Sequence, residues 1–249
     1  MRSIYCIGGV IIFLSLFAGV PVVAGALAPA EILAKADEAR GNLAGIAWEI
    51  KIVSMERGRT QERSLKVKAK SFNSLAEFVA PAKVKGQKIL MRDRNMWFVK
   101  PGLRKPVPLS PRQKLMGQAA SGDIASTNYA GDYKVAKMSQ VQLDGQDCYL
   151  FDLVAASKKV TYDKIRYWVS KKRLVGMQAE FYTVSGKMFK SARFEYGNQV
   201  IIDGITRPFI SQMTITNAVL AAEVTTMHYS RAQIKSIPEA AFNLNLLLR

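Results

Sequence analysis

Strict alternation of apolar and polar residues recurs along most of the chain and constrains the fold more than any other feature. In one segment, Trp48, Ile50 and Ile52 alternate with Glu49 and Lys51. A period of two is typical of a β-strand that buries one of its faces. The same period marks the segments 65–70, 165–170, 188–196, 209–216 and 222–229, and Asp-Gly, Ser-Gly and Gly-Asn turn signals separate several of them.

These segments predict a mainly β chain with about ten or eleven strands. No helical pattern is long enough to serve as a repeated crossover, so the strands are expected to pair antiparallel. Sheets of this size curl to protect their edges, and a curled sheet can enclose a cavity. We therefore predict a single curled antiparallel sheet that forms an open half-barrel, with short helices lining or plugging the cavity.

Two helices are predicted to cover the openings of this half-barrel. Residues 29–40 start with a proline and an early glutamate, place Ile32 and Leu33 at helical spacing, and end at the stop signal Gly41-Asn42. A second, shorter helix is expected to begin near Asp123, which is an acceptable N-cap residue.

The first 26 residues have the features of a cleaved signal peptide. Arg2 gives a short positive start, residues 4–23 are almost wholly apolar, and Ala24-Gly25-Ala26 is an A-x-A cleavage pattern. An uncleaved anchor helix is the alternative, because the apolar stretch approaches the ~20 residues that span a bilayer. We predict cleavage after Ala26, with Ala28 and Ala30 as other possible cut points. Export to the periplasm and one domain over residues 27–249 follow from this prediction.

Removal of the signal peptide leaves Cys148 as the one cysteine, so no intramolecular disulfide is predicted. Cys148 lies in an apolar, strand-like run and is interpreted as a buried structural thiol. The formal net charge is +17, and about +16 once Arg2 is removed. Much of this charge alternates along strands and is interpreted as solvated. No nucleic-acid-binding motif is present, so no nucleic acid partner is expected.

The segment from residue 81 to residue 133 departs from the alternation. Residues 89–91 and 96–99 predict a hairpin that carries Trp97. A basic loop follows, in which prolines fix the backbone and hold the charges apart. A solvated loop without a partner is one interpretation, and docking is the other. The predicted docking residues for a partner or a lipid headgroup are Lys100, Arg104, Lys105, Arg112 and Lys114.

The sequence predicts no enzymatic activity, no metal site and no cofactor. His228 is the single histidine, and no G-x-S-x-G, phosphate-binding loop or H-E-x-x-H motif is present. With Cys148 as the one remaining thiol, the chain lacks ligands for a zinc site. Asp152 and Asp163 lie among apolar or basic residues and are interpreted as solvated or salt-bridged.

Five pieces of the chain occur in a fixed order: Pro81–Leu90, Met96–Phe98, Leu115–Ala119 with Asp123-Ile124, Thr161–Val169 and Gly186–Lys190. In these pieces the chain resembles the periplasmic outer-membrane lipoprotein-sorting (LolA-like) family, and most of all its uncharacterised branch found beside envelope lipid transporters. The resemblance implies an open antiparallel barrel whose helix-lined apolar cavity holds acyl chains. The best-studied sorting carriers lack the long basic loop, so no individual binding residue is transferred from them.

Apolar residues on successive early strands are predicted to line the cavity, with a packed core as the alternative for each of them. Residues 115–129 are predicted to form a movable flap over the cargo, with a rigid plug as the alternative. The predicted cavity residues are Trp48, Ile50, Ile52, Phe78, Leu90, Trp97, Val99, Leu115, Met116 and Ile124.

Two functional classes remain. The first is a monomeric periplasmic carrier that binds lipid acyl chains, or the lipid moiety of a lipoprotein, and transfers them to the outer membrane, with an inner-membrane lipid transporter as partner. The second is a non-enzymatic envelope interaction protein that docks an anionic membrane surface or a transporter through the basic loop. Co-purified lipid is expected in the first class and not in the second.

Overall fold

The protein is described by a computed structural model that covers residues 27–248, and the predicted signal peptide lies outside these residues. Within them, thirteen strands form one antiparallel sheet, and four more form two small two-stranded sheets. A mainly β chain with one open antiparallel sheet is therefore confirmed. The predicted count of ten or eleven strands is wrong, because it is too low for the main sheet.

The strands of the main sheet are β1 (Ile46–Glu56), β2 (Arg59–Lys70), β3 (Asn73–Ala80), β4 (Lys88–Arg92), β5 (Asn95–Val99), β6 (Val107–Leu109), β9 (Tyr133–Leu143), β10 (Gln146–Ala155), β11 (Lys164–Ser170), β12 (Gly176–Tyr182), β13 (Met188–Glu195), β16 (Gln212–Asn217) and β17 (Val224–Ile234). The small sheets pair β7 (Lys114–Met116) with β8 (Ala119–Ala120), and β14 (Asn198–Ile202) with β15 (Ile205–Phe209). Strands such as β6, β7 and β8 cover two or three residues, which is too short to show a period of two.

Six short helical segments complete the described chain. They are the α-helices α1 (Pro29–Glu38) and α2 (Tyr129–Asp132) and the 3-10 helices η1 (Ala82–Val84), η2 (Ser121–Ile124), η3 (Glu239–Phe242) and η4 (Leu246–Leu248). The predicted first helix is confirmed, and Gly41 turns the chain just beyond it with a φ of +101°. No helix within residues 27–248 has the length and apolar character needed to cross a membrane.

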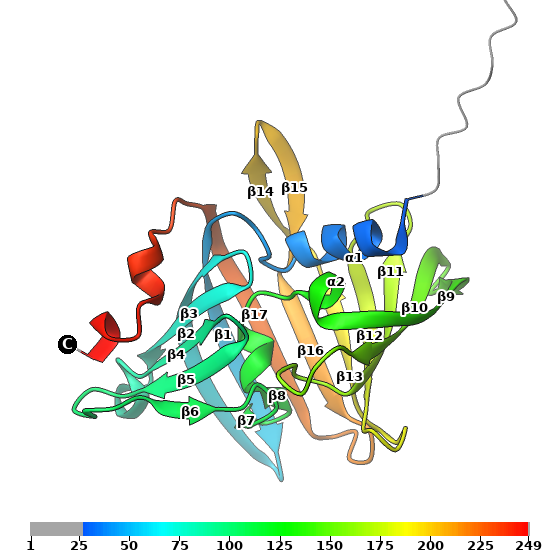
Figure 1. Ribbon diagram of the computed structural model, residues 1–249. Helices are drawn as coiled ribbons and strands as arrows, with labels where there is room; N and C mark the ends of the chain where they lie inside the picture. The colour runs from blue at the N-terminus through cyan, green and yellow to red at the C-terminus, as the bar shows by residue number, and fades with distance from the viewer. Residues whose placement is uncertain (1–26, 249) are drawn as a thin grey trace, which may run out of the picture.

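The main sheet runs in the order β6-β5-β4-β3-β2-β1-β17-β16-β13-β12-β11-β10-β9. The first six strands follow one another as a meander, and β1 then pairs with the last strand, β17. Figure 1 shows the sheet curling so that one side is concave, with α1 and α2 lying against that side. The predicted hairpin is confirmed as β4 and β5, and Asp93 and Arg94 both adopt positive φ at its turn.

The main hydrophobic core lies between the concave side of the sheet and the helices. Alternate residues of β1 are buried there, including Ile46, Trp48, Ile50 and Ile52. The apolar stripe of α1, represented by Ile32 and Leu33, belongs to the same core. Burying one face of each strand and one stripe of the helix stabilises the curled sheet, because each fully buried aliphatic side chain contributes about 1.5–3 kcal/mol.

A second, smaller cluster lies on the other side of the sheet. Leu90 and Trp97 are cross-strand partners in the β4–β5 hairpin. They pack with Ile237 and Phe242 of the segment that follows β17, residues 235–248, which we call the C-terminal segment. Val99 follows Trp97 by two residues and so faces the same side of the strand. These three residues therefore do not line the concave face as predicted. The β4–β5 hairpin is covered on both faces of the sheet, so apolar residues on either face of its strands are buried.

The C-terminal segment should stabilise the sheet from outside. We expect Phe242→Ala to lower the free energy of unfolding by about 3–5 kcal/mol, because the ring is fully buried and its removal leaves a cavity. Urea unfolding measures this effect. Leu246→Ala, at a residue that is 45% exposed, is the control and should change the midpoint little. Equal losses in the two variants would contradict this assignment of the segment.

Candidate functional site

Seven of the ten predicted cavity residues lie together on the concave face. Six of them, Trp48, Ile50, Ile52, Phe78, Met116 and Ile124, are buried members of the main core, and Leu115 packs against it half-buried. Trp48 also contacts Phe209 edge to face, with 5.9 Å between the ring centroids. These side chains form a continuous apolar lining that is packed against its helical cover.

The cover consists of α1 together with residues 121–132, which contain η2 and α2. The Asp37 carboxylate of α1 accepts a hydrogen bond from the Ala130 backbone N–H at 2.8 Å, which joins the two parts of the cover. The Asn42 amide donates to Asn128 Oδ1 at 3.2 Å close to the same point. The predicted second helix begins at Ser121, and Asp123 lies inside it, where its carboxylate accepts from the Ala120 N–H.

Buried polar side chains lie beneath the cover. Arg40 is almost fully buried, and its guanidinium lies 4.4 Å from the ring centroid of Phe194 and 5.3 Å from that of Tyr129. Among the described residues, one guanidinium nitrogen of Arg40, one carboxylate oxygen of Asp37 and the hydroxyls of Tyr167 and Tyr196 have no hydrogen-bond partner. Each such group costs about 1–3 kcal/mol in the closed arrangement.

Burial also raises the pKa of Asp37 from 3.8 to about 7, although hydrogen bonds from the backbone of α2 oppose the shift. The unfolded chain releases this proton near pH 4, whereas the folded chain keeps it until about pH 7. The stability that Asp37 contributes is therefore complete below about pH 4 and is lost as the pH rises through 7.

Asp37→Asn removes this titration but keeps an acceptor for Ala130. We expect the variant to exceed the parent in unfolding free energy at pH 8 by about 2–4 kcal/mol, and to lose part of the decline between pH 4 and 7. Urea unfolding at pH 4, 6 and 8 tests this. Asp152→Asn, at a carboxylate paired with Arg166 on the surface, is the matched control. Superimposable pH profiles for parent and Asp37→Asn would refute the assignment.

Polarity changes along the concave face towards the end of the sheet that lies opposite α1. On β13, the residues that face the concave side are, with increasing distance from the cover, Phe194, Ala192 and Lys190. On β16, the last residue that faces this side is Asn217. Lys190 pairs with Asn217, whose N–H donates to the Glu223 carbonyl at 3.1 Å. On each of four neighbouring strands, the row of residues that faces the concave side therefore ends in a polar residue. These four polar residues lie side by side. We call this row the polar mouth: Glu56 of β1, Glu223, Asn217 and Lys190.

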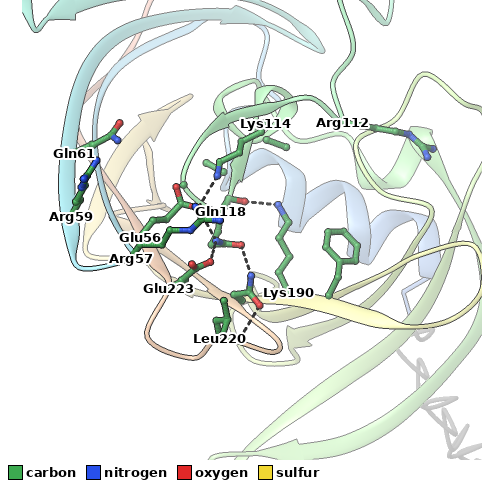
Figure 2. Close-up of a pocket in the computed structure, with 15 residues that line it drawn as sticks. Glu56, Arg57, Arg59, Gln61, Arg112, Lys114, Gln118, Lys190, Leu220 and Glu223 are labelled. Atoms are coloured by element: carbon green, nitrogen blue, oxygen red, sulfur yellow. Dashed lines mark hydrogen bonds and ion pairs between the residues drawn. The ribbon is translucent and has the colours of Figure 1, made fainter.

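Gln118, in the turn between β7 and β8, joins all four residues of the polar mouth. Its side-chain amide donates to Glu56 at 3.4 Å and to Glu223 at 3.2 Å, and it accepts from Asn217 at 3.3 Å. Its backbone carbonyl accepts from Lys190 Nζ at 2.7 Å. One residue thus connects the β7–β8 turn to the ends of four strands, and Figure 2 shows these contacts.

Lys190 and Asp123 form a buried ion pair behind the polar mouth. Lys190 Nζ lies 3.5 Å from Asp123 Oδ2, and the Tyr162 hydroxyl donates to the same carboxylate at 2.7 Å. Burial lowers the pKa of Lys190, and the charge of Asp123 opposes this effect. The pair fixes η2 against β13, and removing one partner would leave a buried charge uncompensated.

A hollow of about 840 Å³ opens at the polar mouth (Figure 2). Its walls come from the turn between β1 and β2, the β7–β8 turn, and the ends of β13, β16 and β17. Five of the side chains that line it are cationic and two are carboxylates. The cationic side chains are Arg57, Arg59, Arg112, Lys114 and Lys190, and the carboxylates are Glu56 and Glu223.

Gly117 allows the β7–β8 turn to approach the sheet at this hollow. Its φ is +56°, and a Cβ atom there would lie 2.0 Å from Ser54 Oγ and 2.2 Å from Thr225 Oγ1. Both hydroxyls are buried in the sheet beneath this turn, where Thr225 accepts from the Gln118 N–H at 2.8 Å. A side chain at Gly117 would therefore push the turn away from the sheet.

We expect Gly117→Ala to lower the unfolding free energy by about 2–4 kcal/mol, through backbone strain and overpacking together. Gly145→Ala is the matched control, since Gly145 also has positive φ (+75°) but has nothing within 4 Å of the added methyl group. Urea unfolding should show a loss of about 1–2 kcal/mol for the control. A loss for Gly117→Ala no greater than that of the control would show that the turn is not tightly packed.

The five predicted docking residues do not lie together as one surface. Arg112 pairs with Asp163 at 2.5 Å, and Lys114 pairs with Glu56 at 2.7 Å, so both belong to the wall of the hollow. Lys100, Arg104 and Lys105 are exposed in the connection between β5 and β6 and do not line the hollow. The predicted docking loop is thus divided between two locations.

Sequence reasoning missed Arg40, Arg57, Arg59, Gln118 and Lys190. One usable signal exists in β1, where the inward positions change from Ile50 and Ile52 to Ser54 and Glu56. For Lys190 no such signal exists, because a lysine on an alternating strand is usually solvated. Its position became clear only from the pairing of β13 with β16.

The remaining individual predictions can also be placed. Cys148 is buried and free, as predicted. Asp152 is paired with Arg166 at 3.1 Å, and Asp163 with Arg112, which confirms the salt-bridged interpretation of both carboxylates. His228 is exposed on β17.

An open antiparallel half-barrel with a helix-covered apolar concave face defines a class of proteins with known structural members. A LolA superfamily protein from Nitrosomonas europaea has a similar structure, with a TM-score of 0.79 and 31% sequence identity over 89% of this chain and 100% of that chain. A family model with the description "Uncharacterized protein" matches residues 70–249. The chain belongs to the LolA superfamily, which confirms the resemblance noted in the sequence.

Two further structures share the fold. An outer membrane lipoprotein-sorting protein domain from Vibrio parahaemolyticus has a TM-score of 0.73 and 20% identity, over 88% of this chain and 98% of that chain. A DUF1329 family protein from Desulfovibrio piger has a TM-score of 0.72 and 22% identity, over 88% and 97%. No curated protein matches the chain in sequence.

Proposed function

We propose that the protein is a periplasmic carrier that holds lipid acyl chains, or the lipid moiety of a lipoprotein, on its concave face and transfers them to the outer membrane. The cargo would lie between the apolar lining around Trp48, Ile50 and Ile52 and the cover formed by α1 and residues 121–132. Residues 1–26 would direct export and be removed. Binding of this kind requires fit and release and no covalent chemistry.

The observation that carries the proposal is that the interface between cover and sheet combines an apolar lining with buried polar groups. It is apolar enough to hold an acyl chain, since burial is worth about 0.8 kcal/mol per CH₂ group. It also contains one nitrogen of Arg40, one carboxylate oxygen of Asp37 and two tyrosine hydroxyls that lack hydrogen-bond partners among the described residues. Contact with two aromatic rings stabilises the Arg40 guanidinium, but its unsatisfied nitrogen carries a desolvation cost that a purely apolar interior would avoid.

These two properties allow the cover to exchange its contact with the sheet for contact with a bound acyl chain. The lining is packed against the cover, so cargo must displace the cover in order to enter. Displacement costs apolar contacts, but it relieves the unsatisfied polar groups, each of which costs about 1–3 kcal/mol. An acyl chain then replaces the lost apolar contacts. The cover is accordingly the part of the structure that we expect to move.

The direct test is extraction of lipid from the purified mature protein, followed by mass spectrometry. A carrier should retain stoichiometric lipid, or take up added phospholipid after delipidation. An envelope interaction protein that docks only through its basic loop would retain none and take up none. That result would reject the proposal.

The tryptophans allow the site of uptake to be located. Trp48 lies on the concave face, Trp97 lies on the opposite face, and Trp168 is half-buried between the inward residues Tyr167 and Val169. Phospholipid with brominated acyl chains quenches only nearby indole rings. We expect quenching of W97F/W168F, which keeps Trp48, to be at least several-fold greater than that of W48F/W168F, which keeps Trp97. Equal quenching in the two variants would place the lipid on the outer surface.

A further inference from the structure

The hollow at the polar mouth carries two cationic side chains that form no ion pair with the described residues. Among the five cationic residues around the hollow, Lys114, Arg112 and Lys190 are paired with Glu56, Asp163 and Asp123. Arg57 and Arg59 line the same hollow and take part in no ion pair among the described residues. They flank Gly58 in the turn between β1 and β2 and are exposed. The outer rim of the hollow therefore presents two guanidinium groups to an incoming anion.

Exposed apolar side chains lie on the loops at the same end of the sheet. Val219 and Leu220, in the connection between β16 and β17, are 74% and 54% exposed, and Leu220 lines the hollow itself. Val184, in the connection between β12 and β13, is 71% exposed. Figure 1 shows the turns after β1, β12 and β16 along the same lower edge of the molecule. Apolar side chains grouped with cations around a hollow are characteristic of a surface that meets a membrane interface.

The interior of the hollow suits the polar part of a lipid. Its inner wall is the polar row joined by Gln118, and the apolar lining begins directly beyond Ser54 and Thr225. Its volume of about 840 Å³ is in the range of pockets that hold whole small molecules. Guanidinium groups bind phosphate through paired, charge-assisted hydrogen bonds. A soluble phosphate ester would use these cations but would have no use for the exposed valine and leucine side chains.

We propose that the hollow at the polar mouth is a binding site for the phosphate-bearing headgroup of an anionic lipid at a membrane surface. Arg57 and Arg59 contact the phosphate, and Val219 and Leu220 enter the interfacial layer beside it. The site positions the end of the half-barrel opposite α1 against the bilayer. It acts at the surface of the membrane and does not require that lipid be carried on the concave face.

The test uses the full mature chain and vesicles of phosphatidylcholine with or without phosphatidylglycerol. We expect binding only to the anionic vesicles, and R57Q/R59Q to weaken it roughly 25-fold, since each cation near an anionic surface contributes a factor of about five. R104Q/K105Q removes the same charge from the exposed loop outside the hollow and is the matched control, with a loss below about threefold. Equal losses in the two variants, or no binding to anionic vesicles, would overturn the proposal.

Two further measurements separate a membrane headgroup from a free phosphate ester. V219S/L220S should weaken binding to anionic vesicles several-fold at high salt, where screening leaves the apolar contribution dominant. Free glycerol 1-phosphate should bind far more weakly than the vesicles. If it binds as tightly as the vesicles and V219S/L220S has no effect, the site takes a soluble ligand and the proposal is wrong. Trp48 quenching by brominated lipid in detergent should be unchanged in R57Q/R59Q, so this test and that of the carrier function fail independently.

Discussion

The pairing of β1 with β17 is the interaction on which the sheet depends, because it joins two meanders that otherwise share no strand. Residues 46–55 align with residues 224–234, so that Ile52 lies opposite Met227 and Ser54 opposite Thr225. The alignment continues through β16 and β13, where Met213 is paired with Phe194. Apolar residues therefore meet apolar residues across four strands, and polar residues meet polar ones at their ends. A shift of one residue would reverse every side chain to the other face and abolish both the lining and the mouth.

The strands were predictable because alternation is a local property, and the curled, open sheet followed from their number. The side of the sheet that each residue faces was harder to predict from the sequence. In the run Ile89-Leu90-Met91 every position is apolar, and only the placement of Phe242 shows that Leu90 belongs to the outer cluster. Trp97 was misplaced for the same reason. Alternation identifies a buried face, but a strand covered on both sides has two such faces.

The polar part of the candidate site was largely beyond sequence reasoning. Lys190 and Gln118 are separated by 72 residues and meet through the β7–β8 turn, which is too short to be recognised from its pattern. Arg40 is the last residue of the predicted helix 29–40, and nothing in the sequence marked it as buried, yet it is almost fully buried beneath the cover. Long-range register decides these positions, whereas the family resemblance indicated only that an apolar cavity exists.

The segment after β17 has a consequence for the surface that the sheet would present to the cell without it. Leu75, Leu90 and Trp97 are hidden by Ile237 and Phe242, which lie in the segment after β17. A copy in which this segment detaches from the sheet displays this group of apolar side chains to water. Chaperones and proteases act on such surfaces. Docking of the segment against the sheet therefore hides a surface that quality control would otherwise recognise.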